Sequence, residues 1–404
     1  MSPYFSVAAL PKSTSEFLWT RNAATSAGAS VASVRLVMAM MTSRAATMVE
    51  MDTSRAFTVP FPIFWNVDER AEPRIDVTKY SYTPRNYTQV GKQCAADPPP
   101  HSNTGCQAWT QGRFPTIDDS GAWIDGGVPQ NADLAAHLDN IRSTLPQWIP
   151  DPNWHGNAVL DFEAWSTVWE LNHGSGHWHG ERYRDASRLL VARAHPSWSA
   201  AAVEAAAKRA FEAAATQWFV KTLDTCRALR PKARWGFYGL PKAAVGDCVG
   251  LGAAMRCGYD GPQGAALRAQ AEVAQLPIWK ASDALYPSIY IPHSMEGKPY
   301  NVSAYIRSTV GEAVRCARLG SKNGGTKPVL PYGWDHFHAP PRPPQRLPTD
   351  FVVAQLQISA SKGAGGVIMW GSSAVWKNDS YWSWLEAEVA PAVHEWCQRH
   401  EGGC

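Results

Sequence analysis

The chain has 404 residues, of which 45% are hydrophobic and 18% charged, and its formal net charge is +3 at pH 7. This length fits two or three domains or one large α/β barrel, and it allows a core that needs no metal or disulfide for stability. So small a net charge gives no basis for a protein that binds nucleic acid or a membrane surface.

Residues 1–56 differ from the rest of the chain, being rich in Ser, Ala, Thr and Met and poor in acidic residues. Their one apolar run, Val31–Met41, contains Arg35 and is too short to span a bilayer. We predict a leader here, either a targeting peptide of the signal or transit type or a disordered segment. No other stretch of the sequence is a candidate transmembrane helix.

Residues 57–404 are predicted to alternate between strands and helices. Apolar runs rich in β-branched and aromatic residues predict strands at 61–67, 158–162, 234–238, 285–291, 328–334 and 366–370. Apolar residues at helical spacing predict helices at 131–145, 199–229, 302–319, 351–362 and 382–400. This alternation predicts a parallel sheet with helical crossovers. Because several strands end in aromatic or polar residues before a loop, we favour one distorted TIM-like (β/α) barrel with outer helices over an open doubly wound sheet.

The eight cysteines include no CxxC pair, which argues against zinc ribbons, zinc fingers and thioredoxin-like sites. Two pairs would close short loops as disulfides: Cys94/Cys106 and Cys248/Cys257. Cys226 and Cys316 fall in predicted helices and fit equally well as buried thiols. Three glycosylation sequons favour a secreted glycoprotein, and they begin at Asn86, Asn301 and Asn378.

Two acidic residues, Asp161 and Glu163, stand at the end of an apolar strand. Side chains two positions apart on a strand point to the same face, so both carboxylates are expected in one cleft. Close carboxylates drive their pKa values apart, which leaves one protonated and one ionised and suits cleavage of a glycosidic bond. The alternative is a pair of ordinary surface acids. Trp165 and Trp169 follow, and they fit either a sugar platform or the core.

Other catalytic classes have little support. The sequence contains no G-x-S-x-G, H-E-x-x-H, G-x-G-x-x-G after the first strand, or P-loop motif. His173, His177 and His179 have spacings that fit a glycine-rich solvated loop better than a metal site. The proline-rich run 340–344 is predicted to be a rigid linker or loop. We therefore expect no metal and no cofactor.

Eight segments in order then resemble the hyaluronidase family of glycoside hydrolases, which includes venom and sperm-type enzymes. The resemblance runs from Phe57 to Trp396 through PFPIFWNV, GGVPQNADLAAHL, DFEAW, ARAHPSW, RPKARWGFYGLP, LYPSIY, KPVLPYGW and GAGGVIMWGSS. It implies a (β/α) barrel over residues 57–404 and a glycosaminoglycan substrate.

The resemblance also implies roles for individual residues. Glu163 is similar to the family's proton donor, and Asp161 to the residue that orients the substrate's acetamido group. In the family the carbonyl oxygen of that group is the nucleophile, so cleavage retains configuration without an enzyme ester. Tyr238 and Tyr290 match tyrosines that line the cleavage subsite, and Trp370 matches the aromatic wall of the acetamido pocket.

Further matches and departures concern the same cleft. Arg307 resembles a substrate-facing arginine, although a helix-surface arginine fits nearly as well, and Trp334 is a further candidate for sugar contact. The family usually has Arg where this chain has Ser166, and often an acidic residue where it has Ala374. Both cysteines of the family's long disulfide are absent, and Cys397 and Cys404 are too few for a C-terminal EGF-like module.

We therefore expect an endo-acting β-N-acetylhexosaminidase that cleaves β-1,4 bonds in hyaluronan. A chondroitin-preferring enzyme, an enzyme for another N-acetylated glycan such as chitin, and a non-catalytic glycan-binding barrel are the alternatives. We expect a monomer without nucleic-acid partners or a membrane span, located outside the cell or in a lysosome-like compartment.

Overall fold

A computed structural model of the chain describes residues 60–66, 82–83, 87–90, 113–174, 180–242, 264–322, 324–338, 344–371, 375, 378–400 and 403–404. Its strands are β1 (Ile63–Asn66), β2 (Tyr82–Thr83), β3 (Tyr87–Val90), β4 (Thr116–Ile117), β5 (Trp123–Ile124), β6 (Asn157–Leu160), β7 (Arg234–Phe237), β8 (Tyr332–Trp334) and β9 (Val367–Trp370). Its α-helices are α1 (Leu134–Trp148), α2 (Arg182–Ala194), α3 (Ala200–Leu229), α4 (Gly264–Ala281), α5 (Pro299–Gly320), α6 (Thr349–Ser361), α8 (Asp379–Trp384) and α9 (Ala390–Arg399).

Apart from β4 and β5, which pair with each other in antiparallel orientation, these strands form two parallel sheets with the orders β2-β1-β9-β8 and β3-β6-β7. Isolated parallel bridges connect the two sheets through residues 285–288, because Tyr286 pairs with Tyr238 beyond β7 and Ser288 pairs with Tyr332 of β8. The strands of these sheets are therefore parallel and alternate with helices along the chain, as predicted. Within the described ranges, however, the hydrogen-bonded strands do not close into a complete barrel.

Most predicted strands are present, and their ends differ by a few residues. The expected strand 285–291 is wrong as a continuous element, since it contributes isolated bridges only. Pro287 interrupts it, because proline has no N–H to donate to a ladder. The pattern also missed α2, whose sequence is rich in arginine, and α4, which contains Pro277.

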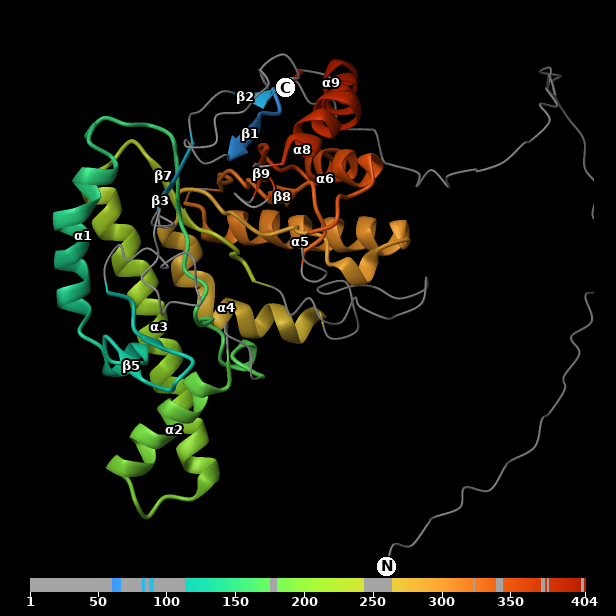
Figure 1. Cartoon of the computed structure of the whole chain (residues 1–404). Coiled ribbons are helices and arrows are strands. Elements are labelled where there is room, and N and C mark those ends of the chain that lie inside the picture. Colours follow the sequence, from blue (N-terminus) through green and yellow to red (C-terminus); the bar gives the residue numbers. More distant parts are fainter. Residues whose placement is uncertain are drawn as a thin grey trace, which may run out of the picture. The chain divides into compact units, whose positions relative to one another are not determined.

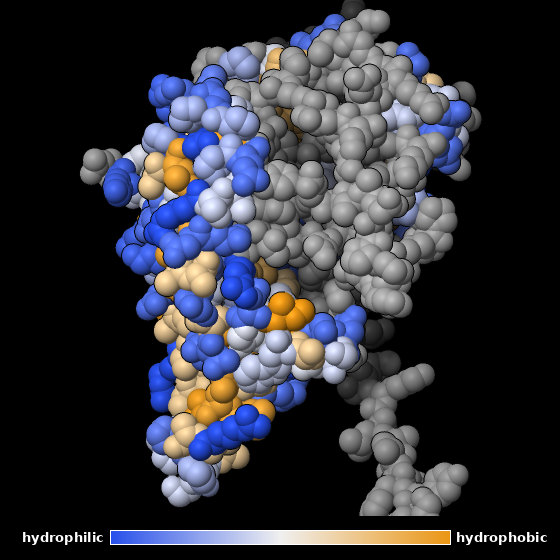
Figure 2. Space-filling model, turned by 60° about the vertical axis from the view of Figure 1, so that its left-hand side comes forward, coloured by the Kyte–Doolittle hydropathy of each residue, from blue (hydrophilic) through white to orange (hydrophobic). Residues whose placement is uncertain are grey.

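The helices lie around the strands (Figure 1), and α2 and the first half of α3 extend away from the strands as a helical hairpin. Side chains cap the N-terminal ends of three described helices, α1, α3 and α8: Asp133 accepts from the N–H of Ala136, Ser199 from that of Ala202, and Asn378 from that of Ser380. On the face shown in Figure 2, hydrophilic residues cover most of the described surface, and hydrophobic residues form separate spots. The helices therefore turn their apolar sides inward.

Tryptophan supplies much of the interior. The largest fully buried side chains include five tryptophans, which are Trp165, Trp169, Trp218, Trp235 and Trp279. Their indole N–H groups find carbonyl or carboxylate partners in several cases, as when Trp218 donates to the carbonyl of Pro129 at 3.0 Å. The high tryptophan content thus serves packing first. None of the described helices is long and apolar enough to cross a membrane.

His137 of α1 is a fully buried titratable residue in this core. Its Nε2 lies 2.8 Å from the hydroxyl of Thr222 in α3. Burial lowers the pKa of His137 from 6.5 to about 3, because a charged imidazole would lose its hydration there. The folded protein therefore keeps this histidine neutral where an unfolded chain would protonate it.

We expect the free energy of unfolding to decrease on acidification because of His137. The unfolded chain binds its proton near pH 6.5 and the folded chain only near pH 3, so this contribution is complete above pH 6.5 and falls by about 1.4 kcal/mol per pH unit below it. Urea unfolding at pH 7, 6 and 5 measures the slope. His137→Gln should flatten it and His155→Gln, at an exposed histidine, should not; equal slopes in all three proteins would contradict the prediction.

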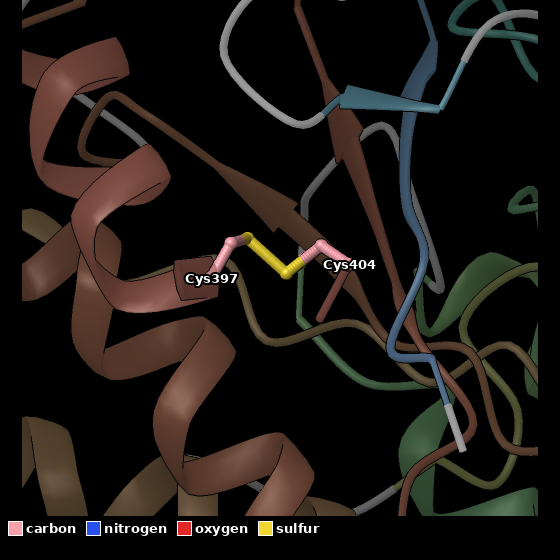
Figure 3. The surroundings of a disulfide bond; sticks show 2 residues. All are labelled: Cys397 and Cys404. Atoms are coloured by element: carbon pink, nitrogen blue, oxygen red, sulfur yellow. A yellow bond between two sulfur atoms is a disulfide. The ribbon is translucent and has the colours of Figure 1, made fainter. Parts of the chain in front are cut away.

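The C-terminal residues pack beside the first strand. A disulfide joins Cys397 of α9 to Cys404, seven positions later (Figure 3). It holds the tail where the carbonyl of Gly403 accepts the N–H of Phe61 at 2.9 Å. Cys226 and Cys316 are buried and not disulfide-bonded, as the sequence allowed. The other four cysteines lie outside the described residues.

Removing this disulfide should destabilise the protein modestly. A loop this short restricts the unfolded chain by about 2 kcal/mol, and a Cys397→Ser, Cys404→Ser double variant should lose up to that amount. Urea unfolding at pH 7 measures the loss. Treating both proteins with a reductant provides the comparison, because their stabilities should then be equal. A double variant as stable as the oxidised wild type would refute the prediction.

Candidate active site

The carboxyl ends of neighbouring parallel strands bring most of the predicted site residues together. Asp161 and Glu163 follow β6, Tyr238 follows β7, and Trp334 and Trp370 are the last residues of β8 and β9. Tyr290 lies in the segment 285–292, whose isolated bridges connect it to residues that follow β7 and to β8 and its flanks. Because parallel strands end at the same edge, all six residues come from one side of the strand ladder.

A cavity of about 270 Å³ opens beside these strand ends. Its lining comes from the loop after β6, the loop after β7, the bridged segment 288–292, α5 and His338. Glu163, Tyr238 and Tyr290 are among the predicted site residues that line it. A carboxyl group and two phenols thus face one cavity that has apolar walls, such as Phe162.

Asp161 and Glu163 lie immediately after β6, whose four residues are all buried. Both acids are half-buried, unlike surface acids, which would be fully exposed. Glu163 lines the cavity and Asp161 does not, yet the charges of both act on Tyr238 and Tyr290. The two carboxylates therefore act on the same pair of tyrosines, but only Glu163 lines the cavity, whereas the sequence spacing predicted both carboxylates in one cleft.

Tyr238 and Tyr290 are neighbours, with ring centroids 5.9 Å apart. The hydroxyl of Tyr238 donates to the Oγ of Ser288 at 3.2 Å. Burial raises the pKa of Tyr238 well above its usual value, and the negative charges of Glu163 and Asp161 raise it further. Burial likewise raises the pKa of Tyr290. Both phenols therefore remain protonated and can donate hydrogen bonds to a carboxylate or a substrate oxygen.

Trp370 and Trp334 form an aromatic wall next to Tyr290. Their rings meet edge to face, with centroids 4.9 Å apart, and Trp370 lies 5.6 Å from the ring of Tyr290. Neither tryptophan is among the residues that line the 270 Å³ cavity itself. Trp334 is only 5% exposed, whereas Trp370 is half-buried, so Trp370 has more surface to offer a ligand.

Hydrogen bonds from α6 and α8 fix the Trp334 side of this wall. The side-chain amide of Gln355, in α6, accepts from the backbone N–H of Trp334 at 3.0 Å and donates to its carbonyl at 2.9 Å. Directly after Trp334, Asp335 lies 2.6 Å from Nδ1 of His336 and accepts from the hydroxyl of Tyr381 at 2.8 Å. These contacts tie the end of β8 to α6 and α8, and they restrict how far Trp334 can move.

The two tryptophans after the acid pair are buried in the core. Trp165 donates its indole N–H to the carbonyl of Pro115 at 2.8 Å and reaches the cavity with part of its surface. Trp169 donates to Glu204 at 2.8 Å, and the guanidinium of Arg184 lies 5.3 Å from its ring centroid. Trp169 is therefore a packing residue that a charged cluster holds in place.

Other predicted positions lie apart from the cavity or outside the described residues. Arg307 is half-buried on α5, two positions from both Tyr305 and Thr309, which line the cavity, and it is not itself part of that lining. Because residues two apart on a helix point to nearly opposite sides, Arg307 faces away from the cavity in this structure. His177, His179, Ala374 and the proline-rich run up to residue 343 lie outside the described residues.

The sequence did not single out several residues that line the cavity. Lys242, Ser288, Tyr305 and His338 all contribute to it. Lys242 comes four residues after Tyr238, in a loop where Gly239 has a φ of +76°. Its position shortly after the end of β7 was the one feature of the sequence that pointed to Lys242. Tyr305 belongs to α5, and the sequence does not show which side of that helix faces the cavity. Among the described residues, no group of three His, Cys, Asp or Glu is placed to hold a metal ion.

A family model described as hyaluronidase matches residues 54–397. Hyaluronidase-1 from Homo sapiens is 38% identical over 66% of this chain and 57% of its own length, and the Bos taurus protein is 37% identical over 65% and 54%. The chain thus matches a little over half the length of these relatives.

Solved structures of a hyaluronidase are also similar to this chain. Bee venom hyaluronidase matches with a TM-score of 0.65 at 27% identity, and the match covers 83% of this chain and 99% of the venom protein. The same enzyme in complex with a hyaluronic acid tetramer matches with a TM-score of 0.64 at 25% identity, covering 83% and 98%.

Proposed function

Since the chain belongs to the hyaluronidase family of glycoside hydrolases, we propose that it is an endo-acting hydrolase of hyaluronan that cleaves the β-1,4 bond next to N-acetylhexosamine. The observation that carries this proposal is the cavity where Glu163 meets Tyr238 and Tyr290 at the carboxyl ends of the strands. The bee venom relative in complex with a hyaluronic acid tetramer supports the choice of substrate.

In the proposed mechanism Glu163 protonates the leaving oxygen and later activates water. Asp161 orients the acetamido group, whose carbonyl oxygen attacks the anomeric carbon, so configuration is retained without an enzyme ester. The protonated Tyr238 and Tyr290 donate hydrogen bonds in the cleavage subsite, and Trp370 forms one wall of the acetamido pocket. Their common edge and the influence of both carboxylates on the two tyrosines support this assignment.

We further propose that residues 57–404 act as one distorted (β/α) barrel, in a monomer that works outside the cell or in a lysosome-like compartment. The parallel order of the strands in both sheets and the bridges between the sheets support the barrel.

A preference for chondroitin is the second candidate. Ser166 favours it, because this cavity-lining residue is small, buried and uncharged where the resemblance leads one to expect an arginine. Its Oγ accepts the N–H of Val168 at 3.2 Å and its N–H donates to Asn172 at 2.8 Å, so it serves the local turn.

The product size profile on hyaluronan, unsulfated chondroitin and chitin oligosaccharides tests the proposal. An endo-acting hyaluronidase should reduce the mean size of hyaluronan early, before small oligosaccharides accumulate. Faster cleavage of chondroitin would select the second candidate. Binding of these polymers without cleavage by the wild-type protein would refute hydrolysis and favour a glycan-binding barrel.

A further inference from the structure

Lys242 is the cationic side chain that reaches the cavity. Of the described residues that line it, Lys242 is the one lysine or arginine, and the carboxylate that faces the same space is Glu163. The charge of Glu163 acts on Lys242, which places the two groups in electrostatic range of each other. None of the catalytic steps proposed above uses this lysine.

The environment of Lys242 is suited to hold a second negative charge. Burial lowers the pKa of Lys242 to about 8, so the ammonium group remains protonated at neutral and acidic pH. Leu240, Pro241 and Phe162 line the same cavity with apolar surface, and a charge pair attracts more strongly where water is excluded. An ammonium group also has three donors, so it can serve two acceptors at once.

The other described cavity residues do not offer a comparable charge. His338 lines the cavity, and burial lowers its pKa, which keeps the imidazole neutral near pH 7. Ser166 and Ser288 contribute only hydroxyl groups. A ligand with a carboxylate would therefore find its positive partner at Lys242.

We propose that Lys242 recognises the carboxylate of the uronic acid next to the cleaved bond, and that it makes the cavity selective for acidic over neutral N-acetylated polymers. This inference rests on the proposed function, because it assumes that the polymer enters this cavity. Hyaluronan and chondroitin both carry the uronate, whereas chitin does not. Lys242 would thus exclude the neutral polymer without choosing between the two acidic ones.

Kinetics of the full chain on a hyaluronan octasaccharide and on its carboxyl-reduced counterpart test the proposal. The wild-type protein should cleave the acidic substrate about 100-fold more efficiently, measured as kcat/KM. Lys242→Met should reduce that ratio towards one, mostly through KM on the acidic substrate. Lys242→Arg should restore part of it, and Lys221→Met, at an exposed lysine of α3, should leave it unchanged.

Two results would overturn the assignment while the proposed function stands. The first is a Lys242→Met variant that keeps the wild-type preference for the acidic substrate. The second is an equal loss on both substrates, which would make Lys242 a positioning residue for Glu163. If the wild-type protein cleaved neither octasaccharide, this would refute the proposed function, and the role of Lys242 with it. Thermal unfolding of each variant identifies any loss of folding.

Discussion

Replacing Glu163 with glutamine is expected to lower hyaluronan depolymerisation by about 10³-fold, because the amide can neither give a proton to the leaving oxygen nor take one from water. Glutamine has nearly the same shape and keeps a hydrogen-bonding group in the half-buried position, so the fold should survive. The fall in viscosity of a hyaluronan solution at constant protein concentration measures the effect.

The matched control is Glu388→Gln, which removes an exposed carboxylate far along the chain, near α9. It should have wild-type activity and an unchanged melting temperature. If Glu163→Gln depolymerised hyaluronan as fast as the wild type, Glu163 would not be the acid and base of the reaction. If it still bound a hyaluronan octasaccharide but did not cleave it, binding and proton transfer would be separated in one variant.

Replacing Gly236 with alanine should destabilise the protein by about 3 kcal/mol, the upper end of what overpacking costs. Gly236 lies in β7, two residues before Tyr238. An added Cβ would lie 2.7 Å from the ring of Tyr286 and still closer to the carbonyl oxygen of Ala284. Real Cβ atoms do not approach other atoms so closely, so β7 would have to move away from the bridged segment.

Gly311→Ala provides the contrast. Gly311 lies inside α5, and an added Cβ there would meet no atom within 4 Å apart from its chain neighbours and the nearby backbone of the same helix. Alanine should therefore stabilise that helix by up to about 1 kcal/mol. Urea unfolding of both variants measures the two changes. Equal stability of Gly236→Ala and the wild type would mean that β7 and residues 284–286 are not packed as described.

The sequence predicted the parts of the fold that depend on local periodicity. The Ala-rich helix after Ser199 and the strand that precedes Asp161 have strong patterns and occur within a residue or two of their expected ends. The segment around Pro287 does not form a continuous strand, because a proline breaks the ladder there. That outcome depends on which neighbours are available, and a linear pattern does not contain that information.

The candidate site, like the fold, could be predicted from the sequence only in part. Strand-end positions brought Glu163, Tyr238 and Tyr290 to one cavity because parallel strands share an edge. The position of Arg307 could not be read in this way, since it depends on the rotation of α5 against the strands. Lys242 was missed because its position shortly after the end of β7 does not by itself show that the side chain lines the cavity.

The pairing of β1 with β9 constrains the order in which the chain can fold. Ile63 pairs with Val367, so about 300 residues separate the two strands along the chain. Closing so long a loop is costly in entropy, and we therefore expect the pairing of β1 with β9 to be a slow and late step of folding. During synthesis on a ribosome β1 emerges early and has to wait for this partner. An apolar strand edge that stays open for so long is prone to pair with other chains. Aggregation during expression is therefore expected to depend on how quickly the last quarter of the protein is made.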